Sequence, residues 1–354
     1  MDNNKEKIKI GQRFVGKEYP AYIIAEVGSN FDGSIERAKM LIDLAKECGA
    51  NAVKFQCFTA EKIISKEAFD KLKVGFQEKW KETVHETYKK AEFPRQWHEE
   101  LFHYANKKGL DFLSAPYDKE AVDILDKLGV PAFKIGSGDI TWHGILKYIA
   151  EKGKPVILAT GASTIAEVDE AIKIIRSAGN DRIILLQCVT NYPSQFEYAN
   201  IRAMKAMGDL FDVPVGYSDH TPGIIVPLGA VALGGCIIEK HFTDDKTRKG
   251  PDHPFAMDGK DFKEMVDSIR LLEKSLGTPL KDVYENEKET VILQQRCLRA
   301  AIDISKGSTI TKDMIDVLRP ADKNAMKPKY EDILTGKKIN TDMKKGDAFT
   351  WEKI

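Results

Sequence analysis

Two short apolar segments of this chain end in ionisable side chains. Residues 236–242 read CIIEKHF, so Glu239 and His241 lie two positions apart. On a β-strand such residues project from the same face, which would place the carboxylate beside the imidazole. Residues 217–220 read YSDH and put a second imidazole, His220, at the end of another strand. Apolar strands have no packing reason to carry such groups, so the pattern indicates a catalytic site.

The two histidines are suited to a divalent metal ion. Two imidazoles with carboxylates nearby would leave coordination positions open to water or to a substrate oxygen. The sequence therefore predicts Mn²⁺ or Mg²⁺ bound by His220 and His241, rather than a closed zinc site. The alternative is that both imidazoles only make local hydrogen bonds.

Two lysines indicate an anionic substrate. Lys54 and Lys134 fall within apolar segments and should be buried, so each needs an anionic or carbonyl partner. Residues 136–138 read GSG and offer backbone N–H groups together with the hydroxyl of Ser137. A metal ion, two lysines and these small donors together suggest a substrate with phosphate and carboxylate groups.

The elements that would position these groups form a regular series, with Gly or Pro at most of the returns. The expected strands are residues 22–27, 52–56, 111–115, 132–135, 155–160, 183–188, 213–217 and 236–242, and the expected helices include residues 35–48, 95–108, 165–178 and 262–276. Eight strand–helix units, with strands too apolar to be half exposed, predict an α/β fold of the parallel (β/α)8 TIM barrel type. A doubly wound open sheet is the alternative, but the first strand is not followed by a GxGxxG motif.

In such a barrel, functional groups are expected at the C-terminal ends of the strands. The candidates in these places are Glu26, Lys54, Gln56, Lys134, Ser137, Tyr192, Ser218, His220, Glu239 and His241. Residues 57–93 form a long connection that should cover this face as a lid or wall.

The last part of the chain has a different pattern. Residues 1–280 are expected to form the barrel, residues 281–295 a polar linker, and residues 296–354 a small, mostly β domain broken by turns. A domain of this size forms only a marginal core by itself. It should therefore pack on its own barrel or on a neighbouring subunit.

Composition argues against several classes of protein. The 54 basic and 54 acidic residues balance, so overall charge would not hold nucleic acid or an anionic membrane. Five scattered cysteines without a CxxC pair are typical of free thiols in a reducing cytoplasm. Residues 223–238 carry no charge, but they are too few for a membrane span and contain Pro227. A buried helix followed by a strand is expected there.

The same residues resemble the sialic acid (N-acetylneuraminate) synthase family, including its legionaminic and pseudaminic acid relatives. The matching motifs are Glu26, Lys54-Phe-Gln56, Lys134-Ile-Gly-Ser-Gly138, Tyr192-Pro193, Ser218-Asp-His220, Glu239-Lys-His241-Phe and Gly250-Pro-Asp252. The tail is similar to that family's antifreeze-like (SAF) domain in Arg296-Cys-Leu, Asp303-Ile-Ser-Lys-Gly307 and Leu318-Arg-Pro320. The resemblance implies a metal-dependent transferase that condenses phosphoenolpyruvate (PEP) with an N-acetylated amino sugar, such as N-acetylmannosamine. The products would be a nine-carbon 2-keto-3-deoxy acid and phosphate.

The resemblance also implies roles for single residues. The metal would be bound by His220 and His241, and PEP by Lys54, Lys134 and Ser137, with Ser218 and Gln56 close by. Glu26 would orient the sugar, Glu239 would transfer protons, and Asp252 would lie near a metal-bound water. Tyr192 would shape the sugar pocket. Family members are homodimers whose tail caps the partner's barrel, so Arg319 would reach the N-acetyl group across the subunit boundary.

Two features depart from the family pattern. Ala115 and Ala159 replace hydroxyl side chains that could face the PEP phosphate, and residues 321–325 replace the Gly-x-Gly turn that follows Arg319-Pro320. Two other functions remain open. One is a Schiff-base aldolase with Lys54 or Lys134 as nucleophile, and the other is a non-catalytic, carbohydrate-binding barrel. The sequence leaves the amino sugar and the native metal undecided.

Overall fold

A computed structural model of the chain describes residues 7–72 and 82–354. The chain divides into two compact units, the first ending at Gly277 and the second beginning at Thr278. Each unit has its own hydrophobic core.

The first unit is a barrel of eight parallel strands in the order β5-β4-β3-β10-β9-β8-β7-β6, with β5 and β6 side by side at the closure. The strands are β3 (Tyr22–Glu26), β4 (Ala52–Cys57), β5 (Asp111–Pro116), β6 (Phe133–Ile135), β7 (Val156–Ala159), β8 (Ile183–Cys188), β9 (Val215–Asp219) and β10 (Ile237–His241). The predicted TIM barrel is confirmed, and the doubly wound alternative is wrong. Because the strands are buried on both faces, their sequences are mostly apolar, and the charged residues that they do contain, such as Lys54 and Lys134, are buried as well.

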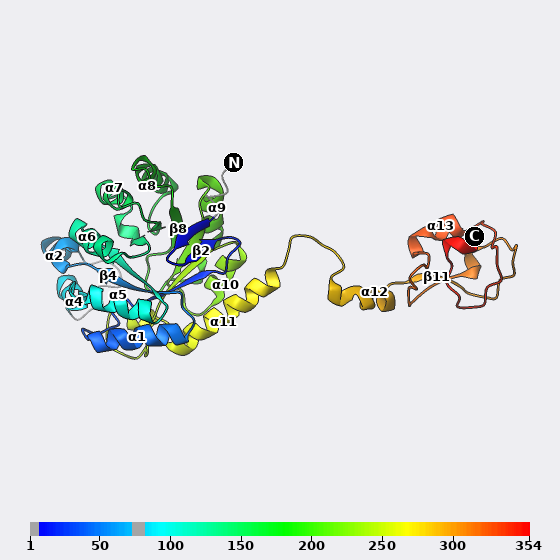
Figure 1. The fold of residues 1–354 in the computed structure, drawn as a ribbon, viewed down its shortest axis with the longest axis horizontal. Helices are drawn as coiled ribbons and strands as arrows, with labels where there is room; N and C mark the ends of the chain where they lie inside the picture. The colour runs from blue at the N-terminus through cyan, green and yellow to red at the C-terminus, as the bar shows by residue number, and fades with distance from the viewer. Residues whose placement is uncertain (1–6, 73–81) are drawn as a thin grey trace. The chain divides into compact units, whose positions relative to one another are not determined.

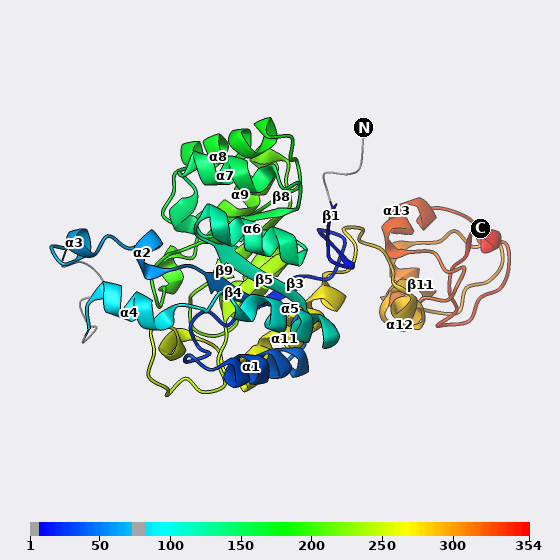
Figure 2. The same ribbon diagram turned by 60° about the vertical axis from the view of Figure 1, so that its left-hand side comes forward.

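Helices surround the strands (Figure 1, Figure 2). They are α1 (Ile35–Glu47), α5 (Trp97–Lys107), α6 (Lys119–Leu128), α7 (His143–Ala150), α8 (Ile165–Ser177), α9 (Ile201–Phe211), α10 (Ile225–Ala232) and α11 (Gly259–Leu276). Three short helices, α2 (Ala60–Ile63), α3 (Lys66–Phe69) and α4 (Val84–Ala91), lie in the connection after β4. Residues 223–238 form α10 and the start of β10, as expected. Among the described helices, none is long and apolar enough to cross a membrane.

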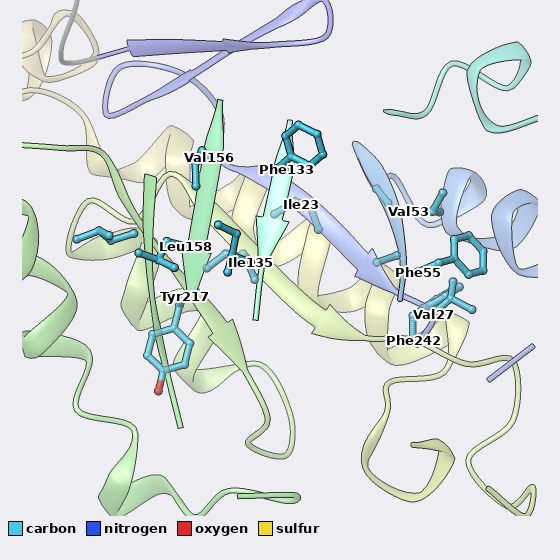
Figure 3. Close-up of a cluster of buried hydrophobic side chains, with 14 of the residues drawn as sticks. Ile23, Val27, Val53, Phe55, Phe133, Ile135, Val156, Leu158, Tyr217 and Phe242 are labelled. Atoms are coloured by element: carbon cyan, nitrogen blue, oxygen red, sulfur yellow. The ribbon is translucent and has the colours of Figure 1, made fainter. Parts of the chain in front are cut away.

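Alternation along the strands separates two layers of core. The outward side chains of the strands pack against the helices, and Figure 3 shows part of this cluster, including Val53, Phe133 and Leu158. The inward side chains in the lower part of the barrel are also apolar, for example Ile24 and Ile237. An antiparallel hairpin of β1 (Lys7–Ile10) and β2 (Arg13–Gly16) packs its apolar side chains against this inner cluster. The N-terminal end of the barrel is therefore a packed core, and its chemistry is confined to the other end.

The second unit is small. Its only ladder among the described residues pairs β11 (Cys297–Ala300) with β12 (Ile315–Leu318) in antiparallel fashion, and most of its other β contacts are single bridges. The segment expected as a linker, residues 281–295, contains a helical turn (Glu285–Glu287) and helix α12 (Lys288–Gln294). A short helix, α13 (Glu331–Leu334), packs Leu334 into the core of this unit.

Candidate active site

The site begins where the inner face of the barrel changes from apolar to charged. On β3 and β10 the inward positions Ile24 and Ile237 are followed, two residues later, by Glu26 and Glu239. Parallel pairing places Glu26 in register with Lys54 on one side and with His241 on the other. Neighbouring strand ends thus bring side chains from distant parts of the sequence into one buried layer.

Two lysines and two glutamates form a connected cluster in this layer. Lys54 Nζ lies 2.8 Å from Glu26 Oε2 and 3.6 Å from Glu239 Oε1. Lys134 Nζ donates to the same Glu239 Oε1 at 3.0 Å. All four side chains are buried, so positive and negative charges alternate in a medium that screens them little.

Two neutral donors complete the contacts of the glutamates. The hydroxyl of Ser218 donates to Glu239 Oε1 at 3.2 Å, and Gln56 Nε2 donates to Glu26 Oε1 at 2.7 Å. Glu239 Oε2 is buried without a hydrogen-bond partner. That oxygen is therefore available to a substrate atom or a water molecule.

The cluster keeps its members ionised. Burial alone would raise the pKa of Glu239, but Lys134 and Lys54 outweigh it and hold that pKa well below its ordinary value. Burial alone would lower the pKa of Lys54, and Glu239 and Glu26 raise it instead. At neutral pH the Glu239 carboxylate and the Lys54 ammonium group are therefore charged.

The two predicted metal ligands lie beside each other, with ring centroids 5.4 Å apart. His220 Nδ1 lies 2.7 Å from the carbonyl oxygen of Val189, which can only accept, so Nδ1 carries the proton and Nε2 keeps a lone pair. Burial, with a smaller effect of His241, lowers the pKa of His220 to about 3, so this imidazole is neutral. His241 Nδ1 is buried and has no hydrogen-bond partner among the residues that the structure describes.

These observations fit a metal ion held by two imidazoles. A buried ring nitrogen without a partner and a neighbouring neutral imidazole fixed through its other nitrogen are what metal ligation requires. Within residues 7–72 and 82–354, no three His, Cys, Asp or Glu side chains converge on one such point.

Asp252 reaches the site from the loop between β10 and α11. Both the backbone N–H and the hydroxyl of Ser29 donate to Asp252 Oδ2, at 2.9 and 2.8 Å. Gly28 permits this approach: its φ is +53°, and a Cβ there would lie 2.5 Å from Asp252 Oδ2 and 3.6 Å from His241 Cε1. Asp252 thus lies next to His241, and only glycine fits at position 28.

A second set of contacts ties the same two loops together. His253 Nε2 lies 2.9 Å from Asp32 Oδ1, and Arg248 donates to Asp32 Oδ2 through both Nε (2.9 Å) and Nη2 (2.7 Å). Asp32 has a φ of +49°, which is uncommon for a residue with a side chain. These ion pairs hold the loop that carries Asp252 against the loop that carries Ser29.

Ser137 is held by the next loop of the barrel. Its Oγ accepts a hydrogen bond from the backbone N–H of Gly161 at 2.9 Å, which fixes the hydroxyl group at the end of the barrel. Ala115 and Ala159 are buried at inward positions of β5 and β7, two residues beyond Leu113 and Ile157. Neither alanine offers a hydrogen bond to an anion in this layer.

A cavity of about 290 Å³ opens beside this layer. Gln56, Tyr192, His241 and Asp252 form part of its wall. The opposite part comes from the long connection after β4, with Phe58, Ile63, Thr87, Tyr88 and Ala91. This agrees with the expectation that residues 57–93 cover the site, although residues 73–81 lie outside the described residues.

Sequence reasoning missed one carboxyl group near this layer. Asp139 ends the helical turn Ser137–Asp139, and its Oδ2 is buried without a hydrogen-bond partner. Burial raises the pKa of Asp139 to about 6. The signal was its place two residues after Ser137, in the turn that follows a strand end.

One predicted site residue lies outside the barrel. Arg319 follows β12 in the second unit and is exposed. The barrel contains the other candidates: Glu26, Lys54, Gln56, Lys134, Ser137, Tyr192, Ser218, His220, Glu239, His241 and Asp252. The ring of Tyr192 lies over His220, with centroids 4.2 Å apart.

Comparison with known proteins gives matches over both units. Residues 41–281 match the NeuB family, and residues 295–354 match the SAF domain. The chain is 38% identical to an N,N'-diacetyllegionaminic acid synthase of Legionella pneumophila, over 96% of each chain. It is 34% identical to the N-acetylneuraminate-9-phosphate synthase of Homo sapiens, over 97% of this chain and 95% of the other. Among solved structures, an N-acetylneuraminic acid synthetase of Leptospira borgpetersenii, crystallised with citrate, superposes with a TM-score of 0.72 at 33% identity, covering 81% of this chain and 95% of that one.

Proposed function

This chain belongs to the sialic acid synthase (NeuB) family, and from that premise we propose that it condenses PEP with an N-acetylated amino sugar. The products are a nine-carbon 2-keto-3-deoxy sugar acid and phosphate. The observation that carries the proposal is the buried cluster of Lys54, Lys134, Glu26 and Glu239 at the C-terminal end of the barrel. Its two ammonium groups can bind an anionic substrate, and its carboxylates can stabilise a developing positive charge.

PEP is bound by Lys54, Lys134, Ser137 and Ser218. The two ammonium groups contact the same oxygen of Glu239, so one anion between them can reach both. Ser137 donates its hydroxyl proton to the phosphate. Since Ala115 and Ala159 give no hydrogen bond, and one to a charged group is worth roughly 1.5–3 kcal/mol, binding depends heavily on the lysines.

The sugar lies in the adjoining cavity, with its aldehyde toward His241. Glu26, fixed by Gln56, accepts hydrogen bonds from sugar hydroxyls, and Tyr192 forms the wall next to His220. The sugar aldehyde carbon bonds to C3 of PEP as the aldehyde C=O π bond opens, and C2 of PEP gains positive character that Glu239 stabilises. A water oxygen then adds to C2, and the aldehyde oxygen takes up the proton that this water loses, becoming a hydroxyl group. Phosphate leaves as the bond between C2 and its oxygen breaks, and the hydroxyl on C2 loses its proton to give the keto group. Asp252, beside His241, accepts a proton from a water molecule there.

We assign His220 and His241 as the ligands of a Mn²⁺ or Mg²⁺ ion, supported by the partnerless Nδ1 of His241 and the neutral imidazole of His220. Such an ion would supply Lewis-acid activation of the aldehyde.

The first test is release of phosphate from PEP in the presence of single sugars. We expect release to require one member of a panel containing N-acetylmannosamine, its 6-phosphate and 2,4-diacetamido-2,4,6-trideoxyhexoses. Absence of release with every sugar would contradict the proposal. A lysine adduct trapped by borohydride would instead favour the aldolase, although the raised pKa of Lys54 keeps that amine protonated and argues against it as a nucleophile.

Asp139 is proposed as the acid that protonates the leaving phosphate, because it lies two residues from Ser137 and its pKa is raised to about 6.

The pKa of Asp139 in the folded protein exceeds the ordinary value of 3.8, so the fold favours the protonated form and loses stability as pH rises from about 4 through 6. A shift of about 2 units corresponds to about 3 kcal/mol at most. Asp139→Asn should therefore raise the Tm more at pH 8 than at pH 5, while kcat falls by roughly a hundredfold. Equal changes in Tm at both pH values would contradict the burial argument, and an unchanged kcat would contradict the catalytic role.

We further propose a cytoplasmic homodimer in which the second unit caps the partner's barrel and Arg319 contacts the N-acetyl group. Support comes from the small core of the second unit, the exposure of Arg319, and five cysteines that are all free and buried. Lys54→Ala and Arg319→Ala should each be nearly inactive, and their co-refolded mixture should regain activity, because one mixed site is then intact. A mixture as inactive as its parents would contradict capping in trans.

A further inference from the structure

A buried ion pair lies between the site residues of β9 and β10, on the opposite face of both strands. Asp219 and Lys240 are in register, and each is only 1% exposed. Their neighbours Ser218, Glu239 and His241 project into the barrel, so alternation directs this pair outward, toward the helices. The mechanism above uses neither side chain.

The contacts of this pair involve the residues on both sides of His220. Lys240 Nζ contacts both Asp219 Oδ2 and the carbonyl oxygen of Thr221, the residues on either side of His220. Asp219 Oδ1 accepts hydrogen bonds from the backbone N–H and from the hydroxyl of Thr221, both at 2.9 Å. A single ammonium group on β10 therefore holds the turn that carries His220 on β9.

The backbone hydrogen bonds between β9 and β10 do not hold the turn that carries His220. Pairing between β9 and β10 ends at the rung of Asp219 and Lys240, so His220 lies beyond the last rung between these strands. His241, in contrast, remains paired with Glu26 on β3. The backbone N–H of Ser194 donates to the carbonyl oxygen of His220 at 2.9 Å, but the backbone pairing between β9 and β10 does not reach this residue. Between these two strands, the position of His220 relative to His241 therefore depends on side-chain contacts.

Stability alone gives no reason for this pair. The side chains around it on the outward faces, such as Tyr217, Ile238 and Phe242, are apolar. Buried ion pairs can often be replaced by apolar side chains of similar size without loss of stability, and setting register is one of their best-attested uses.

We propose that Lys240 and Asp219 are positioning residues, which fix His220 against His241 and so set the geometry of the metal site. The inference rests on the proposed metal site. It adds that this geometry is imposed from outside the barrel, through the turn after β9.

The test compares metal affinity with stability. The double variant Lys240→Met/Asp219→Leu should fold with a Tm at or above that of the unmodified chain. Its affinity for Mn²⁺, measured by titration with detection of free Mn²⁺ by electron paramagnetic resonance, should fall by about 10- to 100-fold. At saturating Mn²⁺, kcat should remain low while the KM for PEP changes little, since Lys54 and Lys134 lie on other strands.

Two further variants make the comparison specific. Asp219→Asn keeps an acceptor oxygen for Thr221 and should retain more Mn²⁺ affinity than the double variant. The Asp219→Asn variant also provides the test if the double variant does not fold. Tyr22→Phe removes a 2.8 Å hydrogen bond to Asp111 at the other end of the barrel, so it should lower the Tm without changing Mn²⁺ affinity.

Two results would overturn the assignment, and they are distinguishable. If the unmodified chain binds Mn²⁺ and the double variant binds it equally well with normal kcat, the positioning role is wrong and the metal site stands. If the unmodified chain binds no Mn²⁺, the metal site itself is wrong, and the positioning role falls with it.

Discussion

Removing divalent cations should stop phosphate release from PEP, and added Mn²⁺ or Mg²⁺ should restore it. The same loss should follow His241→Ala, because its Nδ1 is the buried nitrogen without a hydrogen-bond partner. Lewis-acid activation supplies several kcal/mol, so activity should fall by roughly a thousandfold or more. Phosphate release after treatment with chelator, with and without each cation, measures the effect.

The control is another buried histidine. His98 is fully buried, and both ring nitrogens have partners: Nδ1 lies 3.1 Å from the carbonyl oxygen of Arg95 and Nε2 lies 3.2 Å from Ser114 Oγ. His98→Gln should therefore lower stability and leave Mn²⁺ affinity unchanged. Full turnover in excess chelator, or a His241→Ala variant with normal Mn²⁺ affinity, would show that the imidazole pair is not a metal site.

The second large effect is expected from a residue that has no functional side chain. Gly28→Ala places a Cβ 2.5 Å from Asp252 Oδ2, so Asp252 must leave its position between Ser29 and His241. Displacement of a reacting group by about 1 Å lowers rates by roughly a hundredfold. We expect kcat to fall by that factor, as measured by phosphate release at saturating PEP and sugar.

Gly33 provides a matched control within the same loop. Its φ is +70°, so alanine there suffers a similar backbone strain of about 1–2 kcal/mol, but a Cβ meets nothing within 4 Å. Gly33→Ala should lose comparable stability and keep its turnover. Equal losses of kcat in both variants would mean that backbone strain, rather than contact with Asp252, explains the effect.

Much of the site follows from local rules. A period of two residues places Glu239 beside His241, and apolar strands place Lys54 and Lys134 in the interior. What the sequence cannot give is the choice of partners. Lys54 meets both Glu26 and Glu239 only because β3 lies between β4 and β10 after the barrel closes.

Contacts between loops are still less accessible to sequence reasoning. Ser29 bonds Asp252 over a separation of 223 residues, through loops whose backbone follows no periodic pattern. Asp139 was missed for a related reason, since its raised pKa comes from burial that only the folded turn creates. Helix α12 covers only seven residues, none of them buried, so the sequence has no apolar stripe facing a core that would predict it.

The charged layer also determines how its substrate arrives. Its two ammonium and two carboxylate groups pair with each other, so the cluster contains its own counter-ions. In the binding mode proposed above, PEP would substitute for Glu239 as the partner of both lysines. Binding would then be an ion exchange, with less affinity than two unpaired lysines would give. The lysines would already be held in place, and the displaced carboxylate would be released when a positive charge is about to form beside it.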